Sequence, residues 1–210
     1  MNHWLLWVLV AAALVGGWNW FFHDREMHHP SGAALALSPP AIVLGSDGPS
    51  WVDDHGFQYR ALGRMSGRVV VVSRTNYAIG EFAHLAPTDL AVVWGQLSDP
   101  GTYTQVHFDQ RGSPLSARYV APELKRGTRL AALPFPEVEA FLRMNLAHVH
   151  AIPADKEIAA QLAHIRPGQV VSFSGVLVEA KSPSGGMYVS ATQLGNYHCE
   201  IAWVDDLTLE

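Results

Sequence analysis

The sequence predicts an α+β fold of mostly antiparallel strands, preceded by one N-terminal transmembrane helix. Three observations predict it: an uncharged apolar run near the N-terminus, apolar residues that alternate with polar ones over much of the remainder, and a few segments with helical spacing. Of the 210 residues, 49% are hydrophobic and 16% charged, which is typical of a folded domain. The chain then divides into an anchor at residues 1–22, a linker at 23–50 and a β-rich domain at 51–210.

The apolar run is WLLWVLVAAALVGGWNWFF, from Trp4 to Phe22. Its length suits a helix that crosses a bilayer. A cleaved signal peptide is the alternative, because Ala11 to Ala13 resemble a cleavage site. Aromatic residues continue past that site and no lysine or arginine precedes the run, so an anchor is favoured. We expect a single-pass protein of the bacterial inner membrane, held by residues 4–22, with its soluble domain in the periplasm.

Strands are predicted wherever the apolar period is two. The stretch from Arg68 to Tyr77 is rich in β-branched residues, and Gly63 and Gly67 before it indicate a bulge or a bend. Two hairpins are expected, one from TYTQVHFDQ and LSARYV, the other from GQVVSFSGVLVEA and GMYVSAT. A last strand is expected in CEIAWVDDLTL.

Helices are predicted in three segments. APTDLAVVWG has an early proline and Asp89 in its first turn, and PEVEAFLRM has apolar residues three and four apart. ADKEIAAQLAHIRPG begins with Asp155 as its cap and stops at Pro167 and Gly168. A bent strand, later hairpins and an intervening helix favour an OB-like barrel in the C-terminal part, residues 169–209.

Four blocks of the sequence resemble recurring blocks of a family of membrane-anchored bacterial proteins that has no assigned activity. They are LAPTDLAVVWGQLSD, AHVHAIPAD, GQVVSFSGVLVEA and CEIAWV, which together cover much of residues 60–204. The resemblance implies an anchor followed by a β-rich domain, and it implies no reaction.

Composition excludes several functions. The net charge is −5, and the 14 lysines and arginines form no basic stretch, so nucleic acid is not an expected partner. Cys199 is the only cysteine, which excludes an internal disulfide and a CxxC motif. The chain has no GxSxG, HExxH, P-loop or GxGxxG motif. We therefore expect no catalytic residues and no cofactor, and a non-enzymatic role is favoured over an enzyme.

The segment AHVHAIP holds the metal candidates. His148 and His150 lie two residues apart, so both point to the same side if the segment is a strand. His198, Cys199 or Glu200 would have to complete a site, but adjacent strand residues face opposite sides and the spacing matches no metal signature. The favoured interpretation is structural, with one histidine bonded to a backbone carbonyl. His148, His150 and His198 remain the metal candidates.

The predicted function is that of a membrane-anchored envelope protein, an accessory or docking subunit of a larger membrane complex. Exposed strand edges and loops that carry aromatic residues are frequent docking surfaces. The loop WGQLSD therefore supplies Trp94, Gln96 and Asp99 as candidates for contact with a protein partner. The alternative is a periplasmic protein that binds a metal, haem or a small ligand through His148 and His150.

Overall fold

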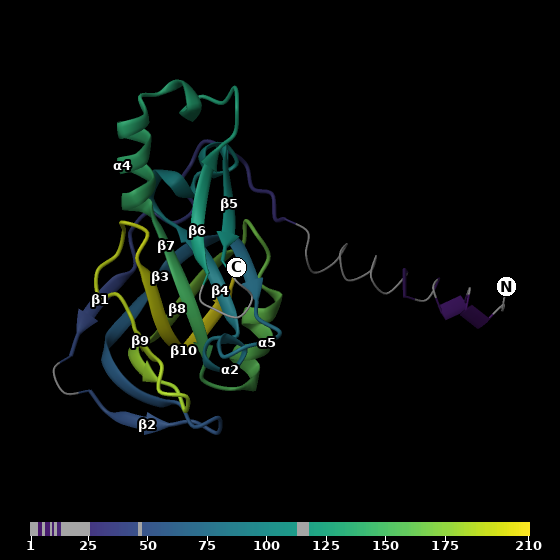
Figure 1. Ribbon diagram of the computed structural model, residues 1–210. Helices are drawn as coiled ribbons and strands as arrows, with labels where there is room; N and C mark the ends of the chain where they lie inside the picture. Colours follow the sequence, from purple (N-terminus) through teal and green to yellow (C-terminus); the bar gives the residue numbers. More distant parts are fainter. Residues whose placement is uncertain are drawn as a thin grey trace.

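The computed structural model describes residues 4–5, 7–8, 10, 12–13, 26–45, 48–112 and 118–210, and its centre is a barrel of five strands (Figure 1). The pairing runs β3–β4–β7–β10–β8 and returns to β3, so the sheet closes on itself. Only the β7–β10 pair of the barrel is parallel, which confirms the β-rich, mostly antiparallel prediction. These strands are β3 (Gln58–Asn76), β4 (Thr88–Val93), β7 (Leu146–Pro153), β8 (Val170–Lys181) and β10 (Cys199–Leu209).

The order of the strands is that of a five-stranded Greek-key barrel of the OB type. A helix, α5 (Lys156–His164), connects the third barrel strand to the fourth and packs Ile158 and Leu162 against the core. The sequence predicts such a barrel for the C-terminal part, whereas the barrel begins at β3 and includes β4 and β7 as well.

The longest strand, β3, bends so that it pairs with both β4 and β8. A bulge lies between Ala61 and Gly63, as the glycines predict. At Gly63 a Cβ atom would lie 2.6 Å from the carbonyl oxygen of Val43. Because Gly63 has no side chain, strand β1 (Ala41–Leu44) can pair closely with β3 at this position.

The globular part starts within the segment that the sequence assigns to a linker. Besides β1, the short strand β2 (Ser50–Val52) pairs with β3, and Ala36 is buried. The Ser98 hydroxyl bonds to both the N–H and the carbonyl of Ala36 at 3.0 Å. Much of residues 23–50 is thus part of the fold.

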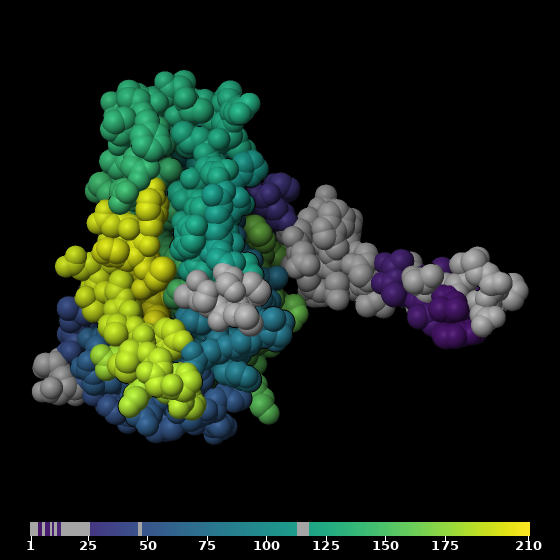
Figure 2. Space-filling view, in the orientation of Figure 1, coloured from purple at the N-terminus to yellow at the C-terminus, as the bar shows by residue number. Residues whose placement is uncertain are grey.

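An insertion between β4 and β7 projects from one end of the barrel (Figures 1 and 2). Its antiparallel hairpin lies near the predicted place, but strand β6 shares only Tyr119 and Val120 with the predicted LSARYV. Its helix α4 is as predicted. The remaining short strand, β9, pairs with β8 in the second predicted hairpin. The elements of the insertion are η1 (Gly95–Ser98), α3 (Pro100–Tyr103), β5 (Val106–Arg111), β6 (Tyr119–Leu124), η2 (Leu130–Ala132) and α4 (Phe135–Asn145). Strand β9 (Met187–Val189) lies outside the insertion, after β8.

The prediction of a helix in APTDLAVVWG is wrong, because Thr88–Val93 within this segment form strand β4. All six residues of β4 are buried, since the strand is covered on both faces and so shows no period of two. The connection from β3 to β4 does contain a short helix, α2 (Phe82–Leu85), which ends before Pro87.

The predicted transmembrane helix requires correction. In the part of the chain that the structure describes, no helix combines the length and the apolarity needed to span a bilayer. The described residues of the run, 4–5, 7–8, 10 and 12–13, are helical and exposed. The same finding contradicts the predicted location as a single-pass protein of the inner membrane, because that prediction depended on this helix. Most of residues 4–22 lie outside the described residues.

The N-terminal cap of α5 is confirmed. The Asp155 carboxylate accepts a hydrogen bond of 2.8 Å from the N–H of Ile158. We predict that Asp155→Ala lowers the free energy of unfolding by about 1 kcal/mol, because this N–H loses its partner. Urea denaturation would measure the change, with Asp155→Asn as a control that keeps most of the cap. Equal losses in both variants would contradict the role of the cap.

Candidate functional site

The site lies on the outer face of the barrel wall, where β7 runs between β4 and β10. Along β7, Val149 faces the barrel interior, so His148 and His150 face outward. In the strand registers, Asp89 of β4 lies opposite His150, and Cys199 of β10 lies opposite His148. Residues from three strands therefore meet on one face.

Asp89 holds the two histidines from one side. Its Oδ1 lies 2.6 Å from Nδ1 of His150, and its Oδ2 lies 3.6 Å from Nε2 of His148. The Tyr77 hydroxyl donates to Oδ2 and accepts a hydrogen bond from the N–H of Arg118. Burial disfavours the charge of Asp89, but the two imidazoles outweigh it and lower the pKa of this carboxyl.

Cys199 completes the cluster on the opposite side of the imidazoles. Its Sγ lies 3.6 Å from Nδ1 of His148. One nitrogen of His148, one nitrogen of His150 and this sulfur all lie within 4.8 Å of one another. Against the effect of burial, the two histidines lower the pKa of Cys199 to about 6. Burial lowers the pKa of a histidine, but Asp89 and Cys199 outweigh it and raise the pKa of His150 to about 9. The pKa of His148 is raised as well.

Apolar side chains enclose these polar groups. The exposed fractions of His148 and His150 are 1% and 2%, and Cys199 is partly buried. The Phe82 ring lies 5.4 Å from the ring of His150 and 5.2 Å from that of Tyr188. Phe82 comes from the β3–β4 connection and Tyr188 from β9, so two connections cover the barrel face at this point.

The third histidine candidate lies apart from the cluster. His198 is exposed, and its Nδ1 contacts the carbonyl of Gln193 at 3.1 Å. The interpretation in which a β7 histidine bonds a backbone carbonyl does not describe the contacts of His148 and His150, which involve Asp89 and Cys199. Sequence reasoning missed Asp89 because β4 was taken for a helix. It missed Tyr77 because the contact of Tyr77 with Asp89 became visible only once β4 was placed as a strand.

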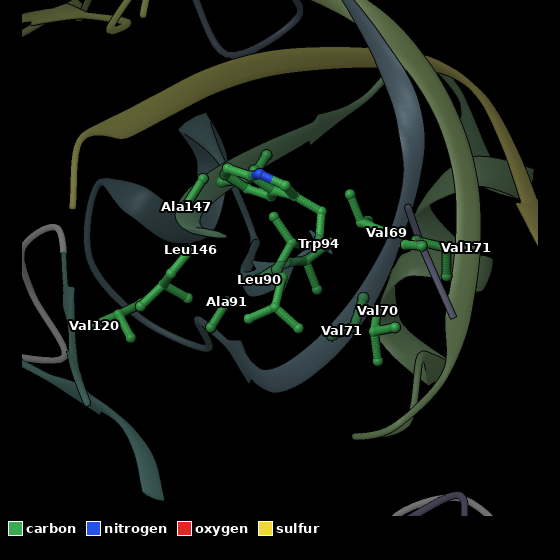
Figure 3. Close-up of a cluster of buried hydrophobic side chains, with 14 of the residues drawn as sticks. Val69, Val70, Val71, Leu90, Ala91, Trp94, Val120, Leu146, Ala147 and Val171 are labelled. Atoms are coloured by element: carbon green, nitrogen blue, oxygen red, sulfur yellow. The ribbon is translucent and has the colours of Figure 1, made fainter. Parts of the chain in front are cut away.

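The candidates for contact with a protein partner lie at the start of the insertion. Trp94 is 3% exposed and packs into the core, where Figure 3 shows it among aliphatic side chains of the barrel. The Asp99 carboxylate accepts from the N–H of Gly101, at the start of α3, and from that of Gly32. Of the three, Gln96 is the exposed one. Their role in partner binding stays a prediction.

Glu200 follows Cys199 but faces the other way. Its register partner is Val149, which lines the barrel interior. Its carboxyl is fully buried, and neither oxygen has a hydrogen-bond partner among the described residues. Burial, and secondarily the charge of Cys199, raise the pKa of Glu200 to about 9. This side chain is therefore a neutral acid at pH 7.

Two kinds of chemistry fit this cluster. Two imidazoles and a thiolate are a ligand set for zinc or copper, with Asp89 as the group that orients the ligands. The same atoms also form a chain from Cys199 to His148 to Asp89, which is the order of groups in a nucleophilic thiol site.

The ionisation of Glu200 yields a prediction for stability in the metal-free protein. Its pKa in the folded state is raised from 4.5, so its contribution to stability is complete below pH 4.5 and declines as the pH rises through about 9. The loss amounts to at most about 1.4 kcal/mol per pH unit in that window. Glu200→Gln should abolish this slope, which denaturation at several pH values measures. If the free energies of unfolding of the wild-type chain and of Glu200→Gln differ by the same amount at every pH, the prediction is contradicted.

Comparison with known proteins assigns no family: the chain matches no family model, no curated protein and no solved structure.

Proposed function

We propose that the protein binds a thiophilic transition-metal ion through His148, His150 and Cys199. The observation that carries this proposal is the convergence of the three donors on one side of the two imidazoles, with Asp89 on the other side. A carboxylate behind a ligating histidine is a recurrent feature of metal sites, because it fixes the tautomer and the ring orientation.

The distances agree with ligation. Zn–S and Zn–N bonds of about 2.3 and 2.1 Å at a tetrahedral angle place sulfur and nitrogen about 3.6 Å apart. Sγ of Cys199 and Nδ1 of His148 are separated by 3.6 Å. The other pairs of donor atoms lie within 4.8 Å, so a shift of about 1 Å would close them around an ion.

The contacts with Asp89 favour the tautomers that ligation requires. When the His150 ring is neutral, its Nδ1 donates to Asp89 and its Nε2 keeps a lone pair for a metal. His148 is turned the other way: Nε2 faces Asp89 and Nδ1 faces Cys199. The two rings thus direct different nitrogens, Nδ1 of His148 and Nε2 of His150, to the region beside Cys199 where an ion would bind.

Charge also supports a metal ion. In the metal-free protein the pKa values of both histidines are raised, so protonated imidazoles balance the negative charges of Asp89 and the Cys199 thiolate. A divalent cation would displace the protons from the ligating nitrogens and balance the same two negative charges. A nucleophilic thiol has less support, because three surface pockets of about 340 to 350 Å³ in the described part of the chain are all lined by other residues.

The direct test is metal content. We predict that the purified full chain binds one equivalent of Zn²⁺ or copper, measured by elemental analysis and titration after treatment with a chelator. Cys199→Ser and His150→Ala should lose stoichiometric binding. His198→Ala is the matched control, since this histidine is outside the cluster, and it should retain the metal. Circular dichroism checks that each variant is folded. Failure of the wild-type chain to bind either metal would contradict the proposal.

A second test concerns Asp89. Asp89→Asn keeps the shape of the side chain but removes its charge, so both imidazoles become poorer donors. We predict a loss of metal affinity of about 10- to 100-fold, measured by competition with a chromophoric chelator. Asp109→Asn changes an exposed carboxylate on β5 and serves as the control. An unchanged affinity in Asp89→Asn would show that Asp89 does not support the ligands.

The docking role that the sequence predicts stays a prediction, and it is independent of this site. The metal proposal corresponds to the alternative function based on His148 and His150, with Cys199 added and His198 left out.

A further inference from the structure

We infer, on the basis of the proposed metal binding, that the ion is copper and that the site is a mononuclear electron-transfer centre. His148, His150 and Cys199 would form the plane around an ion that alternates between Cu(I) and Cu(II). This goes beyond metal binding, because it specifies the element, the coordination number and the reaction.

The number of donors favours copper over zinc. Structural zinc sites have four protein ligands, and catalytic zinc sites have three and an open position for water or substrate. Two histidines and one cysteine in a trigonal arrangement are the donors of copper electron-transfer centres. In the described part of the chain, the cluster has these three donors.

The neighbouring carboxyls are not placed to act as a fourth donor. Oδ1 of Asp89 is bonded to His150 and Oδ2 accepts from Tyr77, so both oxygens are engaged behind the imidazoles. Glu200 lies on the opposite face of β10. Phe82 also lies against His150, and both imidazoles are almost fully shielded from solvent, which disfavours the open water position of a catalytic zinc ion.

The positions of the donors suit electron transfer. All three are on β7 and β10, which are paired strands within a closed barrel. The backbone cannot move far without breaking the pairing, so Cu(I) and Cu(II) would be held in similar geometry. Ligands that need little rearrangement between the two oxidation states allow fast electron exchange.

The single cysteine makes a lasting thiolate–Cu(II) bond feasible. Free thiolates reduce cupric ions in the reaction 2 RS⁻ + 2 Cu²⁺ → RSSR + 2 Cu⁺, which needs two sulfur atoms. This chain has only Cys199, and the side chain is partly buried. A disulfide would have to join two copies of the protein at a recessed position.

The proposed step transfers one electron and breaks no bond. Cu(II) with a thiolate ligand accepts an electron from a one-electron redox protein and becomes Cu(I). The reverse step passes that electron to a second carrier of the same class. With ionised Asp89 and Cys199, the site has a formal charge of zero as Cu(II) and of −1 as Cu(I).

The test uses the metal-free full chain, titrated with Cu²⁺ without oxygen. We expect one equivalent to produce an intense visible thiolate-to-copper charge-transfer band and the electron paramagnetic resonance signal of Cu(II). Ascorbate should bleach the band and ferricyanide should restore it. Cys199→Ser should lose the band completely, and His198→Ala should keep it at full intensity.

The outcomes separate this inference from the proposed function. Stoichiometric Zn²⁺ binding with no charge-transfer band for Cu²⁺ would overturn the copper centre and leave metal binding intact. Immediate bleaching with disulfide-linked dimers, seen on a non-reducing gel, would also overturn it. Binding of neither metal would overturn both. If Cys199→Ser proves unfolded, Cys199→Ala, checked by circular dichroism, takes its place.

Discussion

The carboxylate of Asp89 is buried in a sheet that is covered on both faces. Its negative charge therefore needs hydrogen bonds or a countercharge, and the surrounding side chains provide them. A buried charge is tolerated only with hydrogen bonds or a countercharge. His150 and Tyr77 provide the hydrogen bonds, and His148 faces the second oxygen. Because one ring nitrogen of each imidazole is directed at Asp89, the other becomes available on the far side, where Cys199 lies.

The closed barrel makes this arrangement possible. The outward position of His148 and His150 depends on the register of β7 with its neighbours, and a slip of one residue would exchange them for Val149 and Ala151. Closure through the β3–β8 pairing fixes that register, and the glycine-assisted bend of β3 permits the closure. The Arg118 N–H that bonds Tyr77 further connects the site to the insertion.

Local patterns in the sequence were sufficient for much of the fold. The alternation in β8 and β10, the Asp155 cap and the glycines of β3 are features of single segments, and each was predicted. Strand β4 was missed because burial on both faces removes the period of two, and Pro87 with Asp89 imitates the start of a helix. The error concealed the site, since Asp89 in a helix would not lie opposite His150. The pairing of Cys199 with His148 depends on a parallel contact between distant strands, which no local pattern encodes.

Cys199 and Glu200 show how sharply the barrel wall separates two environments. They are adjacent on β10, and burial disfavours the charge of both. On the outer face the histidines outweigh burial and lower the pKa of Cys199 to about 6. On the inner face Glu200 has no hydrogen-bond partner among the described residues, and its pKa rises to about 9. Ionised groups and donor atoms are therefore confined to the outer face, while the core remains uncharged at neutral pH. A metal ion bound at this cluster would interact with the ionised Asp89 and Cys199, and the barrel interior would contribute no opposing charge.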